Sequence, residues 1–291
     1  MNVIAPKTGA EVAQAIEQIP LREVYSERTG ETDNRPFCAE WSIRISEERV
    51  DMARMMVATK TERCSPGQLS AALGTLKGTS ERIRALAEAL LKGRPDLDLL
   101  LGFALAETIP RAKLYVLRPA GRPIGDFSQL SEDILGMAGV PPQWTRNQIE
   151  MAKQCPAFLA LDLRNDGSST GKLYFSFDEE SQVDRYLYGL NARDLRKKLT
   201  QVQTHISDNP TGRLVVTPRA EGDQTVDVTL HAHLNTLPVL HPALDQAWSR
   251  LKMQAQQNGL LPLHYSYASW LSGPTPSESL YYTFSPRSGK V

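Results

Sequence analysis

Polar and apolar side chains alternate along several short segments of this 291-residue chain. In 171–178 (GKLYFSFD), Leu173 and Phe175 fall on one side of an extended backbone, and Lys172 and Tyr174 fall on the other. A period of two is typical of a β-strand, in which successive side chains point to opposite faces. Such segments are therefore predicted to be strands with one apolar face and one polar face.

Five of these segments carry a common triplet, in which a polar residue is followed by Leu or Met and then by Tyr, His or Met. The triplets are Arg54-Met55-Met56, Lys113-Leu114-Tyr115, Lys172-Leu173-Tyr174, Thr229-Leu230-His231 and Ser279-Leu280-Tyr281. They recur about 50 to 60 residues apart, which indicates repeated structural units. A further strand is predicted ahead of each triplet, at 38–45, 100–106, 157–163, 213–217 and 263–270. Turn-forming residues such as Glu221-Gly222-Asp223 join the two strands, so five antiparallel hairpins are predicted.

Between the hairpins the apolar period becomes helical. Helices are predicted at 9–18, 68–92, 128–153, 181–206 and 242–257. Five helix–hairpin units contain ten antiparallel strands, and a sheet of this kind closes into a barrel when helices cover its outer face. We therefore expect an α+β fold, a ten-stranded antiparallel β-barrel surrounded by α-helices, with residues 1–291 forming a single domain.

The two faces of the predicted strands differ in character. The apolar face is expected to lie under the helices and includes Leu114, Val116, Leu173, Phe175 and Leu230. The other face is polar, charged or aromatic and includes Glu40, Arg44, Arg54, Lys113, Tyr115, Lys172, Tyr174, His231 and Tyr281. A closed lumen lined in this way is expected to be a reaction chamber rather than a packed core.

Composition removes several classes of function. Lys plus Arg and Asp plus Glu both number 33, so the formal net charge is zero, and no long-range field attracts nucleic acid or an anionic membrane. No signal peptide and no apolar run long enough to span a membrane is found in the sequence. Cys38, Cys64 and Cys155 are few, odd in number and without metal-ligand spacing, so they are predicted to be reduced thiols. A cytoplasmic monomer with neither nucleic acid nor membrane as partner is expected.

Several short stretches resemble the ABBA-type aromatic prenyltransferases, and most closely the cyanobactin peptide prenyltransferases. They are CAEWSIRIS followed by DMAR within 38–54, LGFALAETIPRAKLYVL (101–117), LLPLHYSYASW (260–270) and the final LYY (280–282). The resemblance implies a prenyltransferase barrel that moves an isoprenoid from its diphosphate to an electron-rich side chain of a peptide, often cyclic. Two alternatives stay open, namely a small phenol, indole or naphthol as acceptor, and a non-catalytic barrel that binds an apolar ligand.

Candidate residues for the donor follow the repeat. Cations at Arg54, Lys113 and Lys172 would neutralise the departing diphosphate, although lysine on a strand often lies on a solvated face. The aromatic residues two positions later are Tyr115, Tyr174, His231 and Tyr281, which the resemblance implies form a tyrosine shield around the allylic cation and also bind diphosphate. The chain departs from that pattern at His231 and at Met56, which would pack beside the prenyl chain. The alternative for the tyrosines is packing as half-buried strand residues.

The acceptor and the end of the prenyl chain involve other positions. Glu40 is the predicted catalytic group, which would orient the acceptor and take its proton, unless it only forms an ion pair with Arg44. His233 and Trp270 are placed in the prenyl and acceptor pocket. Either Val215 or Val216 should face the lumen, because a one-residue slip in register exchanges the two faces of a strand. Valine in place of the bulky aromatics implied by the resemblance favours a geranyl over a dimethylallyl donor.

No metal site is predicted from the sequence. No Asp-Asp-x-x-Asp motif is present, and Asp96 and Asp98 are interpreted as a polar loop before a strand. His231 and His233 share a face but have no third ligand nearby in the sequence. No cofactor is therefore obligatory, and Mg²⁺ would serve only as a counter-ion carried by the diphosphate.

Overall fold

The computed structural model describes most of the central part of the chain. The described residues are 38–45, 50–58, 85–86, 89–90, 92–93, 97–104, 111–118, 124–163, 169–206, 214–236, 249, 253, 260–271 and 277–286. In β1, β2 and β9 the backbone is described without the side chains, and in β10 the described side chains are those of 279–281. The predicted helix at 9–18 lies outside the described residues, as do Cys64 and most of the predicted helices at 68–92 and 242–257.

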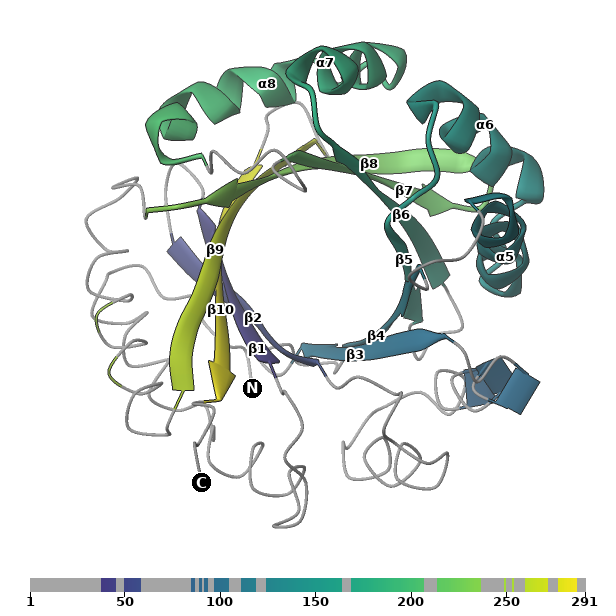
Figure 1. Cartoon of the computed structure of the whole chain (residues 1–291), viewed down its shortest axis with the longest axis horizontal. Coiled ribbons are helices and arrows are strands. Elements are labelled where there is room, and N and C mark those ends of the chain that lie inside the picture. The colour runs from purple at the N-terminus through teal and green to yellow at the C-terminus, as the bar shows by residue number, and fades with distance from the viewer. Residues whose placement is uncertain are drawn as a thin grey trace.

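One antiparallel sheet contains all the described strands. They are β1 (Cys38–Ile45), β2 (Val50–Ala58), β3 (Asp98–Ala104), β4 (Arg111–Leu117), β5 (Phe158–Leu163), β6 (Ser169–Phe177), β7 (Leu214–Glu221), β8 (Gln224–Leu234), β9 (Leu260–Leu271) and β10 (Ser277–Pro286). Hydrogen-bonded neighbours run in the order β2-β1-β10-β9-β8-β7-β6-β5-β4-β3. The two end strands, β2 and β3, also contact each other, so the sheet curves into a ring (Figure 1). The predicted antiparallel sheet is confirmed.

Helices cover the outside of the ring along β5 to β8 (Figure 1). They are α5 (Ile124–Met137), α6 (Pro142–Ala152), α7 (Glu180–Gly189) and α8 (Asp194–Leu199), followed by the 3₁₀ helix η2 (Thr200–His205). Each long helix predicted at 128–153 and 181–206 is thus divided into shorter helices. Gly139, with φ 79°, and Pro141 end the first run, because proline cannot continue a helix and glycine tolerates positive φ. Asn191, with φ 53°, ends α7.

The hydrophobic core lies between the helices and the outer face of the sheet. Leu114, Leu173, Phe175 and Leu230 are fully buried there, as the alternation predicted. Gly171 shows which face is covered, because a Cβ at this position would lie 2.7 Å from Leu135 Cδ2 of α5. Its strand neighbours on the opposite face must therefore point into the ring.

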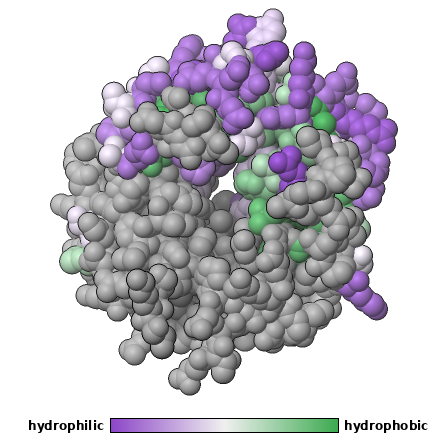
Figure 2. All heavy atoms as spheres, in the orientation of Figure 1, coloured by the Kyte–Doolittle hydropathy of each residue, from purple (hydrophilic) through white to green (hydrophobic). Residues whose placement is uncertain are grey.

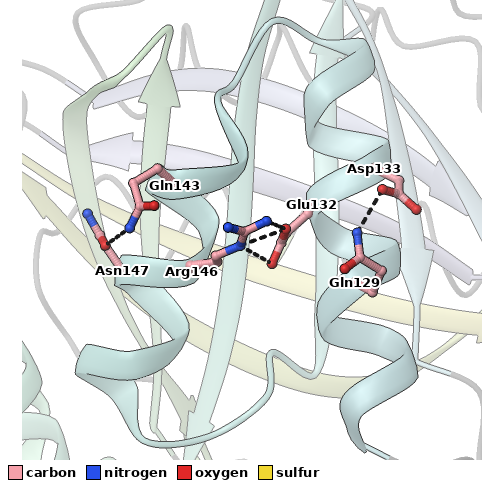
Figure 3. A network of polar contacts seen from close by, with 6 residues as sticks. All are labelled: Gln129, Glu132, Asp133, Gln143, Arg146 and Asn147. Carbon is pink, nitrogen blue, oxygen red and sulfur yellow. Dashed lines mark hydrogen bonds and ion pairs between the residues drawn. The ribbon is translucent and has the colours of Figure 1, made fainter.

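Polar contacts join α5 and α6 on the outer surface (Figure 3). Arg146 Nε donates to both oxygens of Glu132 at 3.0 Å, and Arg146 Nη2 lies 2.8 Å from Glu132 Oε2. Within each helix one further side-chain pair connects neighbouring turns, Gln129 with Asp133 and Gln143 with Asn147. Because these groups satisfy one another outside the ring, the network holds two helices together and is no candidate for ligand binding. No helix among the described residues has the length and apolar character needed to cross a membrane.

Candidate functional site

The inner face of the ring surrounds a hollow. Figure 2 shows an opening at the centre of the molecule, with apolar side chains gathered along one side of it. Strand alternation separates the inner residues from the outer core. A second cluster packs on the inner face and is made of Tyr115, Ala160, Tyr174 and Val215, with Phe158 packed against it. The hollow is therefore lined partly by aromatic side chains, which is the arrangement predicted for the lumen.

A belt of aromatic rings follows the inner face across five strands. The ring centroids of Tyr115 and Tyr174 lie 6.3 Å apart, and Phe158 of β5 fills the space beside both. The ring centroids of Tyr174 and His231 are 6.1 Å apart, and those of His231 and Tyr281 are 5.9 Å apart. The four aromatic residues predicted from the repeat therefore lie close together, although β4 and β10 are far apart in the sequence. Aromatic faces around a cavity stabilise a cation by roughly 0.5–2 kcal/mol each.

Charged side chains form an adjacent layer of the same inner face. Antiparallel pairing sets Lys113 opposite Asp162, and Lys172 opposite Arg219, with Arg219 in turn opposite Asp227. Lys113 and Lys172 lie two positions along their strands from Tyr115 and Tyr174, and Asp227 lies four positions from His231, on the side away from His233. Lys113 Nζ is 3.9 Å from Asp162 Oδ2, and Arg219 Nη2 is 3.8 Å from Asp227 Oδ2. Among the side chains that the structure describes, the inner face thus has an aromatic layer beside a layer of three cations and two carboxylates.

Several buried polar atoms of the charged layer have no hydrogen-bond partner in the protein. They are Asp162 Oδ1, Thr170 Oγ1, Thr217 Oγ1 and Arg219 Nε. Buried polar groups are nearly always hydrogen-bonded, so these four atoms, which have almost no exposed surface, leave the packing behind the inner wall incompletely satisfied. The two hydroxyls and the guanidinium can donate hydrogen bonds, whereas Asp162 Oδ1 can only accept one, so this set of atoms does not by itself select an anion.

His231 is held neutral. Burial, followed by the charges of Lys172, His233 and Lys113, lowers its pKa from 6.5 to about 3. The side chain keeps some accessible surface because the lumen is hollow, but protein surrounds it on all sides. A neutral imidazole can still donate one hydrogen bond, but positive charge on this face comes from lysine and arginine. Burial also lowers the pKa of His233, which lies two residues further along the same face.

The structure separates the two valines of β7. Val215 pairs with His231 and packs in the inner cluster with Tyr115 and Tyr174. Val216 is fully buried in the outer core under the helices, so the prediction that it lines the pocket is corrected. Strict alternation counted from Arg213 places Val215 on the inner face, and the structure agrees with it. The alternation of faces is unbroken here because β7 pairs with β6 and β8 without a register shift from Leu214 to Arg219.

Four predicted site residues have described backbone positions but side chains outside the described part. Arg54 pairs with Ser42, which in turn pairs with Tyr281. Glu40 pairs with Met56 and with Thr283, and Trp270 pairs with Thr229. These registers place the backbone of all four within the same ring of strands as the aromatic belt, and their roles stay predictions.

Phe158, Asp162 and Arg219 are inner-face residues that the repeat did not single out. The repeated triplet occurs on the second strand of each hairpin, and all three lie on first strands. Alternation in 157–163 was a sufficient signal for two of them, because Phe158 and Asp162 oppose the apolar Leu159 and Leu161. Arg219 was missed because the strand predicted there ended at 217, whereas β7 continues through Pro218 to Glu221 with a register shift after Arg219.

Metal ions in proteins are typically held by groups of His, Cys, Asp or Glu side chains. Among the residues that the structure describes, no group of three His, Cys, Asp or Glu side chains could hold a metal ion. The side chain of Cys155 is described, as a buried thiol outside any disulfide, and burial raises its pKa.

Comparison with known proteins gives matches in structure. No protein-family model matches the chain, and no curated protein matches its sequence significantly. The structure of 6-dimethylallyltryptophan synthase from Micromonospora olivasterospora, in complex with DMASPP and Trp, is similar with a TM-score of 0.54 and 16% identity, covering 84% of this chain and 81% of that one. Another 6-dimethylallyl tryptophan synthase structure gives a TM-score of 0.52 and 16% identity, covering 84% and 80%. At this identity the likeness shows a shared fold, so the chain has the fold of these aromatic prenyltransferases.

Proposed function

We propose that this protein is a prenyltransferase that moves an isoprenoid from its diphosphate to an electron-rich side chain of a peptide. The observation that supports it most is the stacking of two layers on one inner face, cations beside an aromatic belt. A diphosphate ester of an allylic alcohol has the same two parts, a polyanion joined to a chain that becomes a cation. The fold shared with dimethylallyltryptophan synthases supports the same reaction class.

The charged layer is suited to the leaving group. In the reaction the allylic C–O bond breaks and the diphosphate departs with the electron pair. Lys113, Lys172 and Arg219 would stabilise the growing negative charge. Arg54 would add a fourth cation. Interactions that strengthen as charge develops lower the barrier, and this is what a fixed row of cations provides.

The aromatic belt is suited to the other fragment. Tyr115, Tyr174, His231 and Tyr281 would surround the allylic cation and keep water away from it. A π bond or lone pair of the acceptor then forms the new bond to carbon. Glu40 would accept the proton that the acceptor loses, and because its side chain is outside the described part, this role rests on the sequence.

The acceptor and the donor length are the finer parts of the proposal. The short motifs at 38–54 and 260–270 resemble peptide prenyltransferases, which supports a peptide, whereas one structural neighbour was solved with Trp. Val215 on the inner wall leaves more room than an aromatic residue would, which supports a geranyl donor. We also propose that the five helix–hairpin units form one complete barrel.

One incubation series tests the function. Cyclic peptides containing Tyr, Trp, His or Arg, and free tryptophan, are offered with C5, C10 and C15 diphosphates, and products are detected by mass spectrometry. Prenylated peptide supports the proposal, and prenylated tryptophan alone replaces the peptide by a small acceptor. If no product forms, calorimetry with isoprenoid diphosphate and the free alcohol decides whether the barrel only binds an apolar ligand, because such a binder would not prefer the diphosphate.

A further inference from the structure

Two carboxylates stand among the cations that the proposed function assigns to the diphosphate. Asp162 lies beside Lys113 at one end of the charged layer, and Asp227 lies beside Arg219 at the other, with Lys172 between them. The side chains of Asp162 and Asp227 are 6% and 8% exposed, so both carboxylates are nearly buried. A site built only to hold a polyanion would not include two buried negative charges, because each repels the ligand.

The two ion pairs are loose. Their N···O distances are 3.9 and 3.8 Å, beyond the length of a hydrogen bond, and Asp162 Oδ1 and Arg219 Nε have no hydrogen-bond partner. The ion pair of Arg146 with Glu132 on the outer surface closes to 2.8–3.0 Å with both oxygens engaged. The chain therefore makes a close arginine–carboxylate pair where it joins two helices, whereas the two inner pairs are about 1 Å longer.

At nearly 4 Å, neither carboxylate holds its cation by a hydrogen bond. A diphosphate offers stronger, charge-assisted hydrogen bonds than a carboxylate at nearly 4 Å, so Lys113 and Arg219 would turn to it when it enters. The carboxylates stay close by and oppose it, because two negative charges in a poorly screened lumen repel each other strongly. When the diphosphate leaves, each carboxylate regains its cation.

We propose that Asp162 and Asp227 are internal competitors of the diphosphate, which weaken its binding and speed its release. This inference rests on the proposed function, since it needs a diphosphate in the charged layer. It assigns the two residues a part in turnover that is separate from bond breaking. An enzyme with three or more cations around its product would otherwise hold inorganic diphosphate tightly and turn over slowly.

The sign of one measurement distinguishes this role from a structural one. Inorganic diphosphate is titrated by calorimetry into wild type, Asp162→Asn and Asp227→Asn, with Asp133→Asn on the exposed side of α5 as the matched control. If the carboxylates compete, each inner variant binds diphosphate about tenfold more tightly, equal to ~1.4 kcal/mol, and releases it more slowly in stopped flow. If they only position Lys113 and Arg219, the inner variants bind it more weakly.

Each result has a defined meaning. Equal or weaker binding by both inner variants, with wild type binding normally, overturns this inference and leaves the proposed function standing. Failure of wild type and of both inner variants to bind inorganic diphosphate overturns both. Asparagine has the shape of aspartate, so folding should persist, and thermal unfolding checks it. The rise in Tm caused by diphosphate should be larger for Asp162→Asn and Asp227→Asn than for wild type, because a ligand stabilises in proportion to its affinity.

Discussion

Phe158 and Tyr174 stack face to face on the inner wall of the ring. They are register partners in the β5–β6 ladder, their ring centroids are 4.0 Å apart and their planes differ by 19°. Phe158 has no polar group to offer a diphosphate, so its contribution is the shape of the wall and the orientation of the neighbouring tyrosine. Tyr174 was predicted from the repeated triplet to face the lumen, whereas Phe158 lies outside that triplet.

Replacing Phe158 should therefore widen the lumen. Phe158→Ala removes the ring that fills the space beside Tyr115 and Tyr174, and should shift donor preference toward longer prenyl chains by severalfold, since each additional buried methylene contributes about 0.8 kcal/mol. Competition between C5, C10 and C15 diphosphates, analysed by mass, measures the shift. Leu159→Ala, on the outer face of the same strand, should lose stability without a change in preference. An unchanged product ratio in Phe158→Ala would remove Phe158 from the donor pocket.

The two valines of β7 should respond in opposite ways to one substitution. Val215→Phe narrows the inner wall next to Tyr174 and should shift preference toward the dimethylallyl donor. Val216→Phe forces a ring into the filled outer core and should lower the free energy of unfolding by about 1–3 kcal/mol with no such shift. Donor competition and urea denaturation on both variants separate the effects. The geranyl hypothesis fails if wild type already prefers the C5 donor at matched concentrations.

The lysines of the charged layer should matter for the donor and little for folding. Lys113→Ala and Lys172→Ala should each cost roughly 1.5–3 kcal/mol of diphosphate binding, because charge-assisted hydrogen bonds to a phosphate oxygen are lost. Donor titration and turnover measure the loss. Lys197→Ala is the matched control, since this lysine is 81% exposed on α8 and pairs only with Asp194. Full activity in the Lys113→Ala/Lys172→Ala double variant would disprove the assignment.

Replacing Glu40 should slow product formation without changing the affinity for the donor. If it takes the proton from the acceptor, Glu40→Gln should bind isoprenoid diphosphate as wild type does, yet form product about 10²–10⁴ times more slowly. Calorimetry with the donor and single-turnover kinetics measure the two properties on the same preparation. Turnover equal to wild type would leave Glu40 as the partner of Arg44 in a structural ion pair.

Stability should depend on pH through His231. Its pKa is about 3 in the folded chain and returns to about 6.5 when unfolding exposes the imidazole to water. As pH falls from about 6.5 toward 3, the unfolded state binds a proton that the folded state does not, so the free energy of unfolding falls by up to about 1.4 kcal/mol per pH unit. Urea denaturation across this range should give a shallower slope for His231→Gln than for wild type. Equal slopes would mean that His231 is protonated in the folded chain.

Local alternation was enough to predict much of this molecule. The period of two in 171–178 and 225–234 placed β6 and β8, and it assigned Lys172, Tyr174 and His231 to one face and Leu173 and Leu230 to the other. It did so because a strand turns its side chains through a fixed period whatever surrounds it. Helix boundaries were less accessible, since Gly139 and Asn191 interrupt runs whose apolar spacing continues on both sides.

What only the tertiary structure decided concerns pairs of residues on different strands. The register of β7 against β6 and β8 chose Val215 over Val216, a choice that propensity cannot make because both are the same residue type. The curvature of the sheet brought Tyr281 of β10 to His231 and set Asp162 and Asp227 among the cations. Alternation along one strand states which face a side chain takes, whereas its neighbours across the sheet, and therefore its charge environment and pKa, depend on how separate strands align in space.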